Sequence, residues 1–363
     1  MAIAVTPFTG PDEEWDRFVR AQPGWTHFHL AGWRRIYQRV FGHECLYMAG
    51  RREDGKTGSG TDGQADGTGE LRSPSRLSAV LPLVRVRSRL FGHYLVSLPY
   101  VNYGGPLGDA ESVRALVDRA VEIARADGVK LLELRSRHEL PLDLPVSHRK
   151  VTVVLDLPKE DPEPLWKSFP AKVRSQVRRP TKEGVTVRFG PDQVEPFYAV
   201  FAHHMRDLGT PVLPRRFFEA VAAEFPESAW FGCAWLGERP IACGAGFVWN
   251  GEFEMTWASA LSEYNRIAPN MLLYWSFMER AVKAGLGTFN FGRCTPEGGT
   301  HRFKKQWGSR DEPLWWYQRT PTGEPASTPS PDDGAYSWGP RLWKKLPVSL
   351  ATMIGPRIVR GIP

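Results

Sequence analysis

Apolar and polar residues alternate along the chain in two different periods, and these periods predict where strands and helices form. In the first half, short runs rich in Val, Leu and Tyr predict strands, and one amphipathic stretch predicts a helix. The strands are expected at residues 45–49, 77–86, 93–99 and 130–135, and the helix at residues 112–127. This half therefore has the pattern of an α/β unit.

The second half has a longer and clearer pattern. The turn signals at Gly237–Pro240 and Asn250–Gly251 separate three apolar runs and predict an antiparallel meander. Strands are expected at residues 185–189, 229–235, 241–248, 252–259, 288–291 and 314–317, and helices at residues 172–182, 194–205, 214–225 and 270–284. One strand, two helices, three antiparallel strands, a helix and a strand is the element order of an N-acetyltransferase-like (GNAT) domain.

The length of 363 residues is enough for two domains of ordinary size. We expect an α/β (α+β) fold of tandem acetyltransferase-like domains, each a mixed sheet flanked by helices. The expected boundaries are 1–157 and 158–320, followed by a linker and a basic, amphipathic tail at 321–363. Residues 51–76 contain six Gly and only two apolar residues, so we expect a disordered insertion there.

Charge and cysteine content limit the classes of function. The formal net charge is +7, and the sequence pI is near 9.3, which suits phosphates, RNA or an anionic membrane surface. The four cysteines form no CxxC pair and have no histidine at a ligand spacing, so neither a structural zinc site nor a disulfide framework is expected. No P-loop and no paired-glycine dinucleotide turn stands out, and neither a metal nor a bound cofactor is expected. No apolar run reaches about 18 residues, and the N-terminus lacks a basic signal region. We therefore expect a cytoplasmic protein. DNA is not expected as a partner.

Two basic segments are candidates for substrate contact. Residues 289–308 (FNFGRCTPEGGTHRFKKQWG) predict a short strand followed by a glycine-rich, basic loop, which suits an anionic substrate at Arg293, Lys304 and Lys305. Residues 167–182 carry six basic residues and no acidic one. If this segment is helical, it is either a solvated surface helix or a phosphate or RNA contact through Lys172, Arg174 and Arg178.

Two helix ends provide further candidates. Arg206 is expected at a helix C-terminus within MRDLGTP, where it either stabilises the helix dipole or binds a carboxylate or phosphate. Asn270 is near the start of the long helix, where free backbone N–H groups can bind phosphate. The turn before it, residues 265–269, contains no glycine, which favours a donor other than coenzyme A.

Five segments together resemble the FemAB family of aminoacyltransferases, which transfer amino acids from aminoacyl-tRNA to peptidoglycan precursors. The resemblance covers nearly the whole chain and is closest to the branch associated with exosortase and PEP-CTERM exopolysaccharide systems. The segments are LPLVRVRSRLFGHYLVSLPYVNYGG, FPAKVRSQVRRPTKEG, MRDLGTP, PNMLLYWSFMERA and FNFGRCTPEGGTHRFKKQWG.

The resemblance implies roles for individual residues. The Phe-Lys pair of the family matches Phe303 and Lys304, and it makes Lys304 the group that stabilises charge during acyl transfer. Arg206 and Tyr264 match positions in the acceptor cleft, between or beside the two domains. The basic helix at 172–179 and the turn containing Asn102 and Tyr103 are expected to line the same groove.

The resemblance implies acyl transfer to an amine or hydroxyl of a lipid-linked or nucleotide-linked envelope precursor, with Lys304 and Arg293 near the reacting centre. The donor is aminoacyl-tRNA or acyl-CoA. The proton acceptor is left open among His203, His204, Asp207, Glu254 and Glu297.

One alternative belongs to a different class, a non-catalytic scaffold that binds an anionic polymer or membrane. The tail mixes basic with apolar residues and could lie on the inner face of an anionic membrane, or it packs on the domain. Its prolines and glycines argue against one continuous helix.

Overall fold

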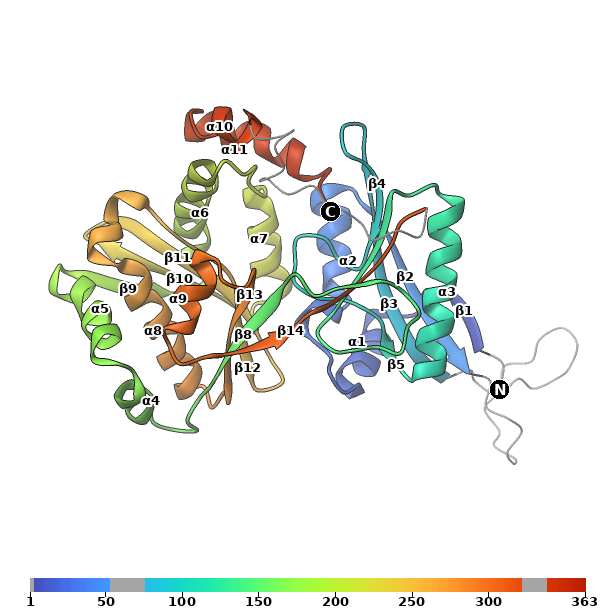
Figure 1. The fold of residues 1–363 in the computed structure, drawn as a ribbon, viewed down its shortest axis with the longest axis horizontal. Helices are drawn as coiled ribbons and strands as arrows, with labels where there is room; N and C mark the ends of the chain where they lie inside the picture. Colours follow the sequence, from blue (N-terminus) through green and yellow to red (C-terminus); the bar gives the residue numbers. More distant parts are fainter. Residues whose placement is uncertain (1–2, 53–75, 322–337) are drawn as a thin grey trace, which may run out of the picture. The chain divides into compact units, whose positions relative to one another are not determined.

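The computed structural model describes residues 3–52, 76–321 and 338–363, which form two compact units (Figure 1). Unit 1 contains the described residues before His148 together with the strand that begins at Trp315, and unit 2 contains His148–Leu314 and the C-terminal helices. Most of the expected insertion at 51–76 and most of the expected linker lie outside the described residues. The mixed α/β architecture with two mixed sheets confirms the predicted fold class.

Unit 1 is a mixed sheet with the order β1-β2-β3-β4-β6-β15-β7, and β5 pairs with β3. Its only parallel pair among the described strands is β4 with β6. The side chain of Asp109 caps helix α3 by accepting from the Ser112 N–H. The elements are β1 (Ile3–Pro7), α1 (Asp12–Ala21), η1 (His27–His29), α2 (Gly32–Ile36), η2 (Tyr37–Phe41), β2 (Glu44–Arg52), β3 (Arg76–Ser88), β4 (Gly92–Val96), β5 (Leu107–Gly108), α3 (Ala110–Ala126), β6 (Leu131–Ser136), β7 (Val146–Ser147) and β15 (Trp315–Arg319).

Unit 2 is a mixed sheet with the order β14-β8-β13-β12-β11-β10-β9. The elements are β8 (Val151–Asp156), α4 (Glu163–Ser168), α5 (Ala171–Lys182), β9 (Val185–Phe189), η3 (Pro191–Gln193), α6 (Val194–Leu208), α7 (Arg215–Glu224), β10 (Ala229–Leu236), β11 (Arg239–Trp249), β12 (Glu252–Ala260), η4 (Ser262–Ile267), α8 (Pro269–Lys283), β13 (Thr288–Cys294), α9 (Gly299–Lys305), β14 (Arg310–Pro313), α10 (Trp338–Trp343) and α11 (Val348–Val359).

Aromatic side chains fix the helices of unit 2 on both faces of its sheet. Successive residues of a strand point to opposite faces, so neighbours on β10 identify the two sides. Phe231 packs edge-on against Phe197 of α6, whereas Trp230 stacks on Phe253, which in turn stacks on Phe277 of α8. Helices α6 and α8 therefore cover opposite faces.

The predicted meander is present, and its second turn shows why the sequence specifies it. Strands β11 and β12 are joined by Asn250 (φ 46°) and Gly251 (φ 74°), both in the left-handed region that a two-residue hairpin turn requires. Asn and Gly are the residues that adopt this conformation at the lowest cost.

Two predictions about the end of unit 2 need correction. The segment expected as a basic loop folds partly as helix α9, because Lys304 is buried and holds it against β13. The last predicted strand, at 314–317, was expected to complete the second domain, but β15 lies in the sheet of unit 1 and pairs with β6 and β7. The expected break in the C-terminal segment is confirmed, since α10 and α11 are separate helices.

Candidate active site

The sheet of unit 2 opens between the parallel strands β12 and β13. The two strands pair only at their first residues, where Glu252, Phe253 and Glu254 lie opposite Thr288, Phe289 and Asn290. Beyond Glu254, β12 pairs only with β11, and beyond Asn290, β13 pairs only with β8, within the described residues. Residues 255–260 of β12 and 291–294 of β13, which do not pair with each other, are here called the unit 2 opening. Unpaired strand edges can accept an extended substrate as an added strand.

A β-bulge in β12 itself lies at the start of the unit 2 opening. The register of β11 and β12 shifts after Ala245, so that Ala245 faces Trp257 while Gly246 faces Met255. The extra residue on β12 is thus Thr256, next to the start of the opening. A Cβ atom on Gly246 would lie 1.9 Å from the Glu254 carbonyl oxygen, so only glycine permits this close approach.

Buried polar side chains meet at the apex of the opening, where β12 and β13 separate. Asn290 is fully buried, and its Oδ1 accepts from the Thr152 hydroxyl (2.6 Å) and the Gly292 N–H (2.8 Å). Its Nδ2 donates to Glu252 Oε1 (2.9 Å). Glu254, which faces Asn290 across the strands, is also fully buried. Such a network is rigid, because an unsatisfied partner would cost about 1–3 kcal/mol.

Lys304 places a positive charge at the same site. Its side chain is 3% exposed, and Nζ donates to the carbonyl oxygens of Gly292 (2.6 Å) and Arg293 (2.9 Å) on β13. Burial lowers the pKa of Lys304 to about 8, although the nearby Cys294 and Glu254 act in the opposite direction. A buried ammonium that is close to titration is unusual for a purely structural lysine.

Arg293 and Lys305 flank this position. Arg293 is half-buried on β13 opposite Thr152. Its own carbonyl oxygen is one of the two that accept from Lys304. Lys305 points the other way along α9, where its Nζ donates to the Ser309 carbonyl (2.7 Å) and pairs with Asp311 (3.3 Å). The structure therefore brings Arg293 and Lys304 together and gives Lys305 local partners.

The basic helix predicted at 172–182 forms α5 and packs beside α8 (Figure 1). It also contacts η4. Arg174 donates to the carbonyls at the end of α4, Phe169 at 2.7 Å and Lys167 at 3.0 Å. The Arg178 guanidinium lies 5.1 Å from the centre of the Trp166 ring, and Lys172 is exposed. Two of the three predicted contacts thus have structural partners within the chain.

Tyr264 lies in η4, just before α8, and Asn270 is the second residue of α8. Arg239 lies over the Tyr264 ring at 5.3 Å, and Tyr264 packs on the core of unit 2. Helix α8 begins after Ala268, which has a φ of 57° and provides no side-chain cap. Asn270 Oδ1 is buried without a hydrogen-bond partner among the described residues, so this helix start has an unused acceptor.

Arg206 lies in the last turn of α6, as predicted, but its guanidinium binds the C-terminal segment. Nη1 donates to the Leu346 carbonyl (3.1 Å), and Nε is 2.9 Å from Asp207 Oδ1. On the same helix, His204 is hydrogen-bonded to the backbone of Ala260, at the end of β12. Burial lowers the pKa of His204, which favours a neutral imidazole near neutral pH.

In unit 1, the corresponding gap between the parallel strands β4 and β6 is filled by the chain itself. Ser97 N–H donates to the Glu133 carbonyl (2.9 Å), and Gly105 N–H donates to the Arg135 carbonyl (2.8 Å). The Arg135 guanidinium donates to the carbonyls of Leu98 and Val101 from the same loop. No strand edge is therefore left between these two strands for a substrate.

Asn102 and Tyr103, predicted to line the acceptor groove, belong to the loop that fills this gap. Asn102 is buried, and Tyr103 is fully buried, with its ring 5.9 Å from that of Phe28. Within unit 1, both side chains therefore serve the core. Their predicted contact with substrate stays a prediction.

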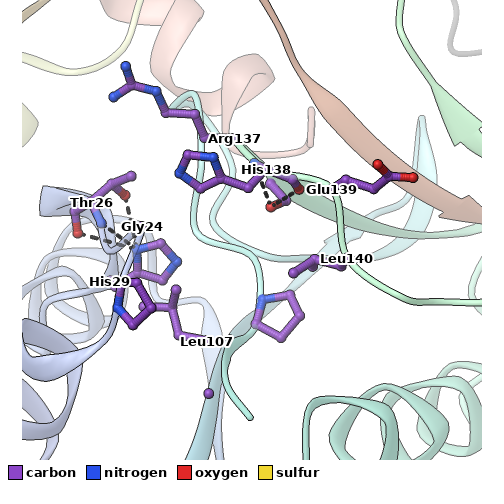
Figure 2. Close-up of a pocket in the computed structure, with 12 residues that line it drawn as sticks. Gly24, Thr26, His29, Leu107, Arg137, His138, Glu139 and Leu140 are labelled. Atoms are coloured by element: carbon purple, nitrogen blue, oxygen red, sulfur yellow. Dashed lines mark hydrogen bonds between the residues drawn. The ribbon is translucent and has the colours of Figure 1, made fainter. Parts of the chain in front are cut away.

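A separate pocket in unit 1, with a volume of about 340 Å³, lies beside η1 and the residues that follow β6 (Figure 2). Its polar side chains mainly bond to their neighbours. His29 Nδ1 accepts from the Thr26 N–H (3.0 Å), and Nε2 lies 2.9 Å from the Gly105 carbonyl. Burial lowers the pKa of His29 to about 4, so its ring stays neutral and both nitrogens are occupied. This pocket is a weaker candidate than the unit 2 opening.

Sequence reasoning missed three residues of the apex, Thr152, Glu252 and Asn290. Asn290 is a polar residue between Phe289 and Phe291, and this was the available signal. Thr152 lies on β8, which was not predicted. No group of three or more metal-ligating side chains occurs in the described parts of the chain, and no helix there is long and apolar enough to cross a membrane.

Residues 167–305 match the family of the acetyltransferase (GNAT) domain. The chain has a tandem GNAT-like fold. The crystal structure of FemX superposes with a TM-score of 0.59 at 15% identity and covers 87% of this chain and 97% of that one. A tandem GNAT protein from the clavulanic acid biosynthesis pathway superposes with a TM-score of 0.51 at 14% identity and covers 90% and 100%.

A conserved protein of unknown function from Bacteroides thetaiotaomicron gives a TM-score of 0.50 at 9% identity, covering 87% of this chain and 99% of that one. No curated protein sequence matches the chain. The matched domain covers most of unit 2, including β12, β13 and Lys304.

Proposed function

We propose that unit 2 is the catalytic unit of an acyltransferase, which moves an aminoacyl or acyl group onto an amine or hydroxyl of a cell-envelope precursor. The observation that carries this proposal is the unit 2 opening, with the buried Lys304 ammonium at its apex. The GNAT family match over residues 167–305 supports the reaction class. The sequence resemblance to FemAB proteins supports a peptidoglycan- or exopolysaccharide-related acceptor.

In the proposed reaction, the nucleophile attacks the carbonyl carbon of an ester or thioester. A new C–N or C–O bond forms, and an oxyanion develops on the carbonyl oxygen. The oxyanion then collapses and expels the ribose oxygen or the thiolate, which takes up a proton. An ammonium close to the oxyanion in a water-poor site could contribute about 3 kcal/mol, as an oxyanion-hole donor does. Lys304 has the burial that this role needs.

The nucleophile must also lose a proton, and geometry favours two of the five candidates. Glu254 lies at the apex of the opening, and His204 lies beside the end of β12 with a lowered pKa. Glu297 is exposed after β13. His203 and Asp207 lie 3.8 Å apart on α6 and face each other. We propose Glu254 or His204 as the proton acceptor.

Two donors are compatible with the site, aminoacyl-tRNA and acyl-CoA. The turn before α8 lacks glycine and includes Ala268 in a left-handed conformation, which restricts close approach of a pyrophosphate and favours aminoacyl-tRNA. The exposed Lys172 on α5, beside α8, could contact a phosphate backbone. No cofactor other than the donor is part of this proposal.

A single-turnover transfer assay tests the proposal. Labelled aminoacyl-tRNA and labelled acyl-CoA are offered separately, with lipid-linked and nucleotide-linked envelope precursors as acceptors. Lys304→Met is compared with Lys283→Met, a matched change at an exposed ion pair on α8. We expect transfer from one donor, lost in Lys304→Met and kept in Lys283→Met. Transfer from neither donor, with folded protein and active precursors, would instead favour a non-catalytic scaffold.

A further inference from the structure

The C-terminal segment, residues 339–363, packs on unit 2 through α10 and one buried stripe of α11. Helix α11 packs beside α6 and buries Ala351, Gly355 and Val359 (Figure 1). A Cβ atom on Gly355 would lie 3.0 Å from the Val212 nitrogen, so the small residue permits a close approach. The Arg206 bond to the Leu346 carbonyl fixes the link between α10 and α11. The segment therefore has a defined inner face and a defined outer face.

The outer face carries large apolar side chains. At 3.6 residues per turn, Leu350, Met353, Arg357 and Arg360 lie opposite the buried stripe of α11. Met353 is 60% exposed, and Leu342 on α10 is 57% exposed. Only five large hydrophobic side chains are exposed in the described parts of the chain, and Leu342 and Met353 are two of them. A monomeric soluble domain normally covers such side chains when they cluster.

The same segment has an unbalanced charge. Residues 339–363 contain five basic side chains and no acidic one. Four of these basic residues form no ion pair with a carboxylate of the described residues: Arg341, Lys344, Lys345 and Arg357. All four cations are exposed. Arg341 is next to Leu342 in the chain, and Arg357 is one helical turn from Met353 on α11, so charge and apolar surface occur together.

We propose that this outer face binds an anionic lipid bilayer and holds unit 2 at the membrane surface. Each basic side chain near an anionic bilayer raises the binding affinity about fivefold through electrostatic attraction. Apolar side chains between the basic ones insert at the boundary of the acyl chains. RNA would engage the same cations but would gain little from Leu342 and Met353. The combination therefore fits a bilayer better than a nucleic acid.

Vesicle co-sedimentation of the full chain tests this inference. The probes are vesicles of phosphatidylglycerol with phosphatidylcholine and vesicles of phosphatidylcholine alone, in about 0.1 M salt. We expect binding to the anionic vesicles and not to the neutral ones. Lys344→Gln/Lys345→Gln should weaken binding at least tenfold, and Met353→Ser severalfold.

Matched controls separate surface binding from general effects. Lys159→Gln/Lys283→Gln removes the same charge from other exposed sites of unit 2, and Leu90→Ser removes an 81% exposed leucine from unit 1. Both controls should bind like the native chain. The inference would be overturned if the chain does not bind anionic vesicles, or if the controls lose as much binding as the test variants. It would also be overturned if the chain binds tRNA but not vesicles and Met353→Ser leaves the tRNA binding unchanged.

Discussion

The pH dependence of acyl transfer should report the protonation of Lys304. Its Nζ is buried beside β13, and burial lowers its pKa to about 8 from an ordinary value of 10.5. If the ammonium stabilises the oxyanion, activity must fall as the pH rises through about 8. At one pH unit above the pKa, about a tenth of the molecules keep the proton, so kcat/KM should drop roughly tenfold.

Lys304→Met tests this reasoning. The variant should lose about 10²–10³-fold in kcat, the usual cost of removing one oxyanion donor, and its residual activity should show no decline around pH 8. Lys283→Met should keep both the native rate and the native profile. The assay is single-turnover transfer with the active donor at a series of pH values. A native rate that rises through pH 8, or an unchanged profile in Lys304→Met, would refute the role of the ammonium.

The same group should affect stability with a predictable sign. Because folding lowers the pKa of Lys304, the unfolded chain binds the proton more tightly between about pH 8 and the ordinary value of 10.5. The native chain should therefore gain up to roughly 3 kcal/mol over this interval relative to Lys304→Met. Urea unfolding of both proteins across this pH range measures the difference. A difference that does not change with pH would contradict the burial of a charged amine.

Three further changes test the geometry of unit 2. Gly246→Ala should destabilise it by about 3 kcal/mol, because the new Cβ meets the Glu254 carbonyl, whereas Gly287→Ala, with no atom nearby, should unfold in urea like the native chain. Asn290→Ala should lower the free energy of unfolding by roughly 2–4 kcal/mol, since three buried partners lose a bond, and a loss below about 1 kcal/mol would contradict the network. Gly355→Leu should release α11 and expose the C-terminal segment to protease, and an unchanged cleavage pattern would argue against its docking.

The sequence was most informative where one element has a strong local signal. The Asn250–Gly251 turn and the long apolar period of α8 predict the meander and helix of unit 2, and the structure contains both. Strand β8 was missed, because the period of a short, mostly apolar run such as residues 151–155 does not distinguish a buried strand from a buried helix segment. The placement of β15 could not be predicted either, since the strand returns to a sheet that begins far earlier in the chain.

The candidate site shows the same limit. Lys304 and Arg293 were identified from a basic, glycine-rich segment, but that pattern predicts an exposed loop and not a buried ammonium. Burial of Lys304 depends on the register shift in β13 between Asn290 and Arg293, where the Gly292 and Arg293 carbonyls bind its Nζ. A register shift depends on partners that are distant in sequence. The unit 2 opening follows from pairing that ends at Glu254, which no local pattern reveals.

Photo-crosslinking of the acyl donor tests the central claim most directly. An aminoacyl-tRNA and an acyl-CoA, each with a photoreactive group on the acyl chain, are bound to the full protein, irradiated and mapped by mass spectrometry. We predict that the donor used in transfer labels residues 255–260 or 291–294, on the two edges of the unit 2 opening. Labelling confined to unit 1, for example around His29 and His138, would contradict the account.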